Sequence, residues 1–173
     1  MKKKIFFDMI LNIVATSIPT VVLQLLILPS LSNYMDGNAY GLMVTILAVL
    51  NVVPSTIGNV LNNVRLLHEE SYNKDNEQGD FQILLTIFQA INLLIMVTVS
   101  IYYLGTKDIT GILLLIAVGI LWLGREYHIV AFRLKLDYIA ILVNNLCLVA
   151  GYGIGYIFFM KNGYWQIIYL FRL

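Results

Sequence analysis

The sequence predicts an all-α protein: a polytopic bundle of transmembrane helices with five full spans, a truncated sixth and a cytoplasmic N-terminus. Of its 173 residues 60% are hydrophobic and 12% are charged, and the mean hydropathy is +0.82, whereas soluble domains average about 25% charged residues. Apolar runs recur that are long enough to cross a bilayer, which takes roughly 20 residues. The distribution of lysine and arginine then sets the orientation. We therefore expect one transmembrane domain over residues 1–173 that contacts the lipid bilayer.

Composition and motifs exclude several functions. The net charge is +1, and the lysines and arginines form no dense run outside Lys2–Lys4, so we expect no nucleic-acid partner. Cys147 is the single cysteine, which rules out an intrachain disulfide and a multi-cysteine metal site; we interpret it as a small packing residue. The sequence has no Asp-x-Asp, no phosphate loop and no His-Glu-x-x-His zinc helix. We expect no enzyme activity, no catalytic residue, no metal and no cofactor.

The first predicted span covers Ile5–Leu31. Three lysines before an apolar run imitate a secretory signal, but the run is long, has no small-residue cleavage site, and is followed by further spans. We interpret it as an uncleaved helix, which Pro19 should bend. One small or polar stripe follows the helical spacing and contains Asp8, Asn12, Ala15 and Pro19.

After a turn at 33–38, the second predicted span covers Tyr40–Leu67. Its polar stripe follows the i, i+4, i+7, i+11, i+14 pattern, with Asn59 beside it, and contains Asn51, Ser55, Gly58, Asn62 and Arg65. Such a face is either buried by neighbouring helices through hydrogen bonds or lines an aqueous cavity. We favour a cavity, because tight packing would select smaller residues. We therefore expect Asn62 and Ser55 to face water within the complete protein while Ile57 and Leu61 do not.

A polar loop is predicted from His68 to Asp80, and the third span from Phe81 to Leu104. One side of this span carries Gln82, Thr86, Gln89, Met96 and Ser100. A tight turn at 105–108 leads into the fourth span.

The fourth predicted span, Gly111–Tyr138, is an apolar run interrupted by ionisable residues, which include Arg125, Glu126, His128 and Arg133. Charges at membrane depth usually face a protein interior or a water-filled cavity and pair there. Alternatively, this is the cytoplasmic end of the helix, where Arg133 is solvated and Arg125 extends to the headgroups. Arg125 and Glu126 lie two turns deeper than Arg133, so the first interpretation suits them better.

The fifth predicted span, Tyr138–Met160, places Asn144, Gly151 and Gly155 on one face, and the Gly-x-x-x-Gly spacing permits close helix approach. After a turn at 161–163, the apolar segment 165–173 has too few residues to cross the bilayer. This incomplete sixth span predicts a truncated or interrupted gene.

With the N-terminus inside, seven basic residues of the helix ends and loops are cytoplasmic and two are external. The cytoplasmic set is Lys2, Lys3, Lys4, Arg65, Lys74, Arg133 and Lys135, and the external set is Lys107 and Lys161.

Two junctions resemble those of a known family. Leu28-Pro29-Ser-Leu-Ser-Asn-Tyr34 with Asn38-Ala-Tyr-Gly-Leu42 is similar to the junction between helices one and two of bacterial polysaccharide flippases. These belong to the multidrug, oligosaccharidyl-lipid and polysaccharide exporter superfamily. The segment 125–138, followed by Asn144-Asn145 and by Gly151-Tyr-Gly-Ile-Gly155-Tyr, resembles the junction between helices four and five.

The resemblance implies export, by flipping, of lipid-linked O-antigen or capsule repeat units across the cell inner (cytoplasmic) membrane during polysaccharide biosynthesis. It implies two six-helix lobes around a cavity whose cations meet the pyrophosphate of an undecaprenyl-pyrophosphate-linked oligosaccharide. The substrate-binding candidates are Asp8, Asn12, Asn62, Arg65, Arg125 and Glu126. This chain would be most of the N-terminal lobe, inactive without a missing C-terminal lobe. The alternative is a small accessory or structural membrane protein whose polar faces pack against partners.

Overall fold

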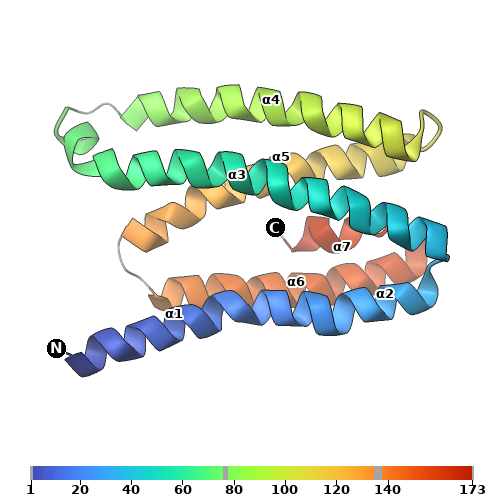
Figure 1. The fold of residues 1–173 in the computed structure, drawn as a ribbon, viewed down its shortest axis with the longest axis horizontal. Coiled ribbons are helices and arrows are strands. Elements are labelled where there is room, and N and C mark those ends of the chain that lie inside the picture. Colours follow the sequence, from blue (N-terminus) through green and yellow to red (C-terminus); the bar gives the residue numbers. More distant parts are fainter. Residues whose placement is uncertain (1, 76–77, 135–137, 173) are drawn as a thin grey trace. The chain divides into compact units, whose positions relative to one another are not determined.

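The computed structural model describes residues 2–75, 78–134 and 138–172, and the side-chain surroundings of residues 10–53, 55–68, 81–130, 132–133 and 138–172. In these ranges all regular structure is helical (Figure 1). The elements are α1 (Lys2–Val22), a π-helical segment η1 (Leu23–Ile27), α2 (Leu28–Tyr34), α3 (Gly37–Asp75), α4 (Gln78–Leu104), α5 (Ile109–Leu134), α6 (Tyr138–Asn162) and α7 (Gln166–Phe171). The all-α prediction is confirmed for the described residues.

Among the described residues, five helical stretches are long and apolar enough to cross a membrane, which is the make-up of a multi-pass membrane protein. These stretches are Ile10–Tyr34, Gly37–His68, Phe81–Leu104, Ile109–Val130 and Tyr138–Asn162. The apolar segment after α6 forms only the short helix α7.

The chain divides into two compact units. Unit 1 contains Met1–Met43 and Ala131–Leu173, and unit 2 contains Val44–Val130. The long helix α3 begins in unit 1 and continues through unit 2.

In unit 1, α6 packs against both α1 and α7. The predicted close approach at Gly151 and Gly155 is confirmed, because α7 lies on this face. A Cβ at Gly155 would lie 2.6 Å from Ile168 Cα, and a Cβ at Gly151 would collide with the carbonyl group of Phe171. Glycine is therefore required at both positions for α7 to lie this close.

The first predicted span is one helical path in which the hydrogen-bonding pattern changes. Ala15 and Pro19, half of the predicted stripe, are buried. The departure from α-helical pairing comes after Pro19, where the N–H of Leu28 donates to the carbonyl of Leu23. A π-helical segment accommodates one extra residue in a helix, and nothing in our sequence reasoning predicted it.

Two predicted loops are shorter in the structure. The predicted loop from His68 is wrong up to Asp75, since α3 continues through that residue. Glutamate and lysine are good helix formers and no glycine or proline interrupts the helix there. The turn after the first span is reduced to two residues, and Asp36 Oδ2 accepts a 3.3 Å bond from the Asn38 N–H.

The turn at 105–108 agrees with prediction, whereas the turn predicted at 161–163 begins only at Gly163, because α6 continues to Asn162. Gly105 and Gly163 adopt φ values of 71° and 76° directly after α4 and α6, a conformation that glycine adopts without steric penalty. Arg133 lies exposed in the last turn of α5. Residues 135–137 of the predicted fourth span lie outside the described residues.

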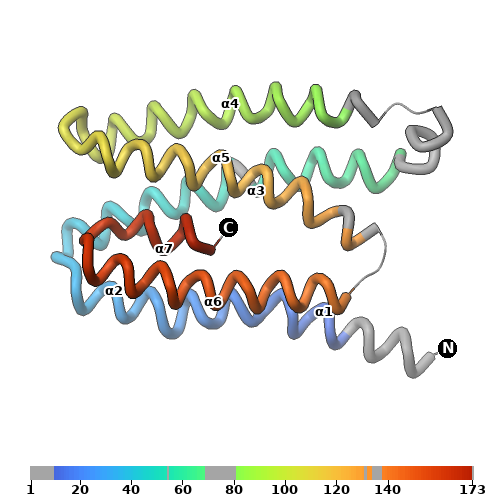
Figure 2. Tube along the Cα trace, turned by 180° about the vertical axis from the view of Figure 1, so that it is seen from behind, coloured from blue at the N-terminus to red at the C-terminus, as the bar shows by residue number. Residues whose placement is uncertain are grey.

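Unit 2 joins three helices. The part of α3 in this unit, α4 and α5 lie side by side in both views (Figures 1 and 2). Leu61, Phe81 and Tyr127, one from each helix, form an apolar cluster that Leu85 and Phe88 extend. This cluster lies beside the charged residues of α5.

Large apolar side chains are exposed along every spanning helix, as is normal for a surface that meets lipid. Cys147 is also exposed on α6, so its interpretation as a packing residue is wrong.

Candidate functional site

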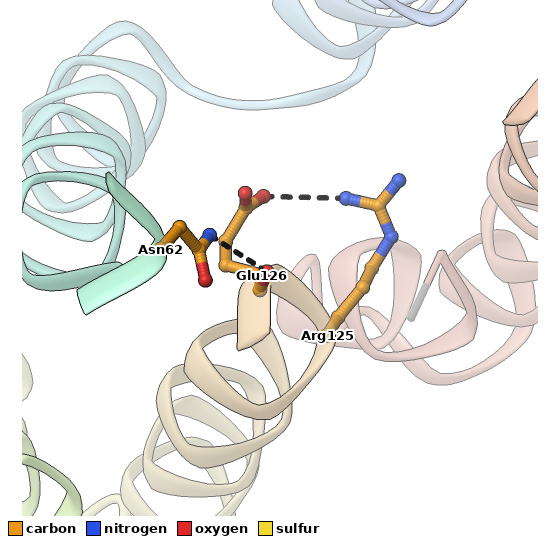
Figure 3. A network of polar contacts seen from close by, with 3 residues as sticks. All are labelled: Asn62, Arg125 and Glu126. Atoms are coloured by element: carbon orange, nitrogen blue, oxygen red, sulfur yellow. Dashed lines mark hydrogen bonds and ion pairs between the residues drawn. The ribbon is translucent and has the colours of Figure 1, made fainter. Parts of the chain in front are cut away.

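The charged centre of unit 2 is an ion pair between neighbouring residues of α5. Adjacent residues on a helix do not normally face one another, yet Arg125 Nη1 lies 3.4 Å from Glu126 Oε1. Figure 3 shows the two long side chains turning toward each other beyond the helix surface. Their relative exposures are 13% and 17%, so the pair is largely shielded. It lies within the apolar stretch Ile109–Val130, about 12 Å along the helix from Arg133.

Asn62 of α3 holds the main chain under this pair. Its Nδ2 donates to the Glu126 carbonyl at 2.9 Å, and the residue is 2% exposed. One turn earlier, a Cβ at Gly58 would lie 2.9 Å from Glu126 Cβ, so the absence of a side chain there lets Glu126 pack on α3. The backbone and Cβ of Glu126 are therefore fixed by two residues of the predicted stripe.

The prediction that Asn62 faces water is wrong for this chain, because its amide is buried against α5. Leu61 is buried as expected, whereas Ser55 and Ile57 are both partly exposed, so the predicted contrast between the two sets fails. Burial by a neighbouring helix, the alternative we did not favour, describes Gly58 and Asn62.

Arg65 is engaged one residue further along α5. Its Nη1 donates to the Tyr127 carbonyl at 3.4 Å, and its guanidinium lies 4.8 Å from the centre of the Tyr127 ring. A guanidinium over an aromatic face is a stabilising cation–π contact. Arg65 thus helps to join α3 to α5.

Two amide side chains of α4 also donate hydrogen bonds to the main chain of α5. Gln89 Nε2 donates to the Ile120 carbonyl at 2.8 Å, and Asn92 Nδ2 donates to the Gly119 carbonyl at 2.9 Å. Asn92 is fully buried. A Cβ at Gly119 would lie 2.6 Å from Met96 Cγ, so the absence of a side chain at Gly119 lets Met96 of α4 pack closely against α5.

Our sequence reasoning missed Asn92. Gln89, Asn92 and Met96 follow the i, i+3, i+7 spacing of a helix face, which is the signal that could have identified it. The predicted stripe instead began at Gln82 and Thr86, and both are exposed.

The amides of Asn62, Gln89 and Asn92 share one feature. Each donates its NH₂ group to a carbonyl of α5, while its buried oxygen has no hydrogen-bond partner in the described structure. Buried polar atoms are normally paired. The amides thus contribute donors to α5 and keep unused acceptors.

The remaining candidates belong to unit 1. Asn12 is exposed on α1, and the side chain of Asp8 lies outside the described residues. The structure therefore joins Asn62, Arg125 and Glu126 in one network, with Arg65 at its edge. It does not show Asp8 or Asn12 as part of that network.

The Arg125 guanidinium is suited to an oxyanion ligand, because arginine binds phosphate and carboxylate through its planar fork. The described residues contain no group of three histidine, cysteine or acidic side chains that could hold a metal ion.

Comparisons with protein-family models, curated proteins and solved structures give no match for this chain.

Proposed function

We propose that this chain forms one lobe of a transporter that flips undecaprenyl-pyrophosphate-linked oligosaccharides across the cytoplasmic membrane. Arg125 would be the cation that meets the pyrophosphate. The observation that carries the proposal is the shielded Arg125–Glu126 pair inside an apolar stretch of α5. A charge at the centre of a membrane helix costs about 2.5–3.5 kcal/mol, and such residues mark ligand and ion pathways.

Arg125 suits this role better than Arg65. Arg65 stacks on Tyr127 and bonds a carbonyl of α5, which are structural contacts. The carboxylate paired with Arg125 comes from its own helix, so displacing that carboxylate does not break a contact between two helices.

A lobe of this kind needs a second lobe. Alternating access in such transporters moves one repeat against another around a site at their interface. We therefore expect residues 1–173 alone not to restore surface polysaccharide in a strain that lacks its flippase. Restoration by this chain alone would refute the one-lobe proposal.

We also propose that the N-terminus is cytoplasmic, on the strength of the lysine and arginine distribution. Reporter fusions at Asn76 and Asn162 should then report opposite sides of the membrane. The same side for both would contradict the orientation.

Lipid binding tests the role of Arg125 directly. Purified chain in lipid nanodiscs is titrated with undecaprenyl pyrophosphate, and bound lipid is counted by native mass spectrometry. Arg125→Ala should weaken binding at least about tenfold, since hydrogen bonds to charged groups contribute about 1.5–3 kcal/mol. The control is Lys107→Ala, in the turn after α4, which removes the same charge. Equal affinities for all three proteins would reject Arg125 as the binding cation.

The second candidate is an accessory or structural membrane protein. It is favoured by the use of Asn62, Gln89 and Asn92 in helix packing, as expected for polar faces that hold helices together. An accessory protein should show no preference for the lipid pyrophosphate, so the same titration separates the two candidates.

A further inference from the structure

We infer that Glu126 competes with the anionic ligand for Arg125 and thereby sets how tightly an anion must bind to occupy this site. The inference rests on the proposed function and reassigns one residue that the sequence predicted to bind substrate. In the structure, the Glu126 carboxylate pairs with the Arg125 guanidinium. A phosphate group that binds this guanidinium must displace the carboxylate.

The geometry of the pair favours displacement. The contact joins one guanidinium nitrogen to one carboxylate oxygen at 3.4 Å, whereas strong charge-assisted bonds measure about 2.7–2.9 Å and are often bidentate. A phosphate that offers two oxygens to the planar fork would make the better partner. The carboxylate and the phosphate carry the same sign of charge and repel each other at short range.

The release of Arg125 by Glu126 needs no movement of the Glu126 main chain. The Glu126 carbonyl is held by Asn62, and its Cβ packs on Gly58, so the main chain stays in place while the outer torsions of the side chain turn. Figure 3 shows the carboxylate standing clear of the bond that Asn62 makes. Loss of the carboxylate should therefore leave the α3–α5 bond intact.

Competition of this kind raises the affinity that a ligand needs in order to occupy the site. The bilayer contains a large excess of phosphodiester lipids with one negative charge, and a bare arginine at membrane depth would bind them too. Every anion must displace the same carboxylate, so the ion pair weakens the binding of each anion by the same factor. Only anions that bind Arg125 well then occupy the site, and Glu126 sets this affinity threshold.

Two lipids test this role in nanodiscs. The probes are undecaprenyl phosphate, a phosphomonoester, and phosphatidylglycerol, a phosphodiester, each titrated by native mass spectrometry. Glu126→Gln should bind both lipids about threefold to tenfold more tightly, because both must displace the same carboxylate in the unmodified chain. Asp36→Asn is the matched control: it removes one negative charge in the turn before α3 and keeps an oxygen that can accept from Asn38.

A second measurement follows the ion pair itself. Phenylglyoxal modifies arginine, and peptide mass spectrometry gives the rate at each position. Arg125 should react faster in Glu126→Gln than in the unmodified chain, while Arg65, held at Tyr127, serves as the internal reference and should not change. Glu126→Ala also removes the carboxylate and should shift both measurements in the same direction.

The outcomes are distinct. Tighter binding and faster modification in both Glu126 variants support competition, and a gain of this kind is not expected from damage to the fold. Weaker or unchanged binding in these variants, with Arg125→Ala still losing affinity, overturns competition and leaves the proposed function standing. Equal binding by the unmodified chain, the Glu126 variants and Arg125→Ala overturns both.

Discussion

The two units differ in their most prominent helix contacts, although unit 1 also contains a hydrogen bond between Ser30 and Tyr156 and unit 2 also contains close contacts at Gly58 and Gly119. In unit 1, α7 lies directly on the backbone of α6 at Gly151 and Gly155. In unit 2, side chains reach across to the main chain of α5. The donors are Asn62, Arg65, Gln89 and Asn92. The stability of a helix contact that depends on close approach should fall when a side chain is enlarged there. The stability of a contact that depends on hydrogen bonds should fall when a donor side chain is removed.

The largest effect is expected at Gly155. An alanine Cβ would lie 2.6 Å from Ile168 Cα, and backbone cannot rotate away as a side chain can, so we expect Gly155→Ala to lower the free energy of unfolding by about 3 kcal/mol. Denaturant titration in detergent, followed by circular dichroism, measures it. At Gly153 a Cβ would meet nothing within 4 Å, so Gly153→Ala should be neutral or slightly stabilising. Similar losses at both positions would show that close approach is not what holds α7.

A smaller loss is expected for Asn92→Ala in unit 2. The change removes a buried donor to the Gly119 carbonyl, and interhelical hydrogen bonds in membrane proteins contribute about 0.6 kcal/mol on average and at most about 1.7. We expect a loss of about 1 kcal/mol in the same titration. Asn51→Ala is the control, because the amide of Asn51 bonds Leu47 of its own helix and is exposed. An unchanged Asn92→Ala would mean that amide donors do not hold unit 2.

The smallest effect is expected at Arg65. Arg65→Gln removes the cation over the Tyr127 ring, a contact that contributes about 0.5–1 kcal/mol at partly exposed sites. A double-mutant cycle with Tyr127→Leu isolates the coupling between the two side chains. Zero coupling would show that the cation–π contact does not contribute to stability and would leave Arg65 only its bond to the Tyr127 carbonyl.

Much of the fold could be predicted because hydropathy and helix-breaking residues indicate spans and turns from the nearby sequence alone. The predicted third span agrees with the apolar stretch Phe81–Leu104, and the start of the fifth span agrees with α6 at Tyr138. The glycine pair at 151 and 155 was also assigned its correct packing role. The extension of α3 to Asp75 was missed because we equated polarity with loop structure, although charged residues with high helix propensity can continue a helix beyond its apolar part.

The candidate site was harder to predict, because the partner of a polar side chain depends on a helix elsewhere in the sequence. A stripe on the second span is compatible with water or with a neighbouring helix, and only the position of α5 shows that Asn62 bonds Glu126. The helical wheel separates Arg125 from Glu126 by about 100°, but it ignores side-chain length, which lets the two charges meet. The flipping of lipid-linked sugars and the orientation stay predictions.

The bonds to α5 also restrict how that helix can move. They end on the carbonyls of Gly119, Ile120, Glu126 and Tyr127, spread over about two turns. Advancing a helix by one residue translates it about 1.5 Å and rotates it about 100°, so a screw motion of α5 past α3 and α4 would break all of these bonds together. These bonds therefore oppose a piston-like sliding of α5 within unit 2. A conformational change that moves the main chain at Arg125 and keeps these bonds would have to move the bonded parts of α3, α4 and α5 together.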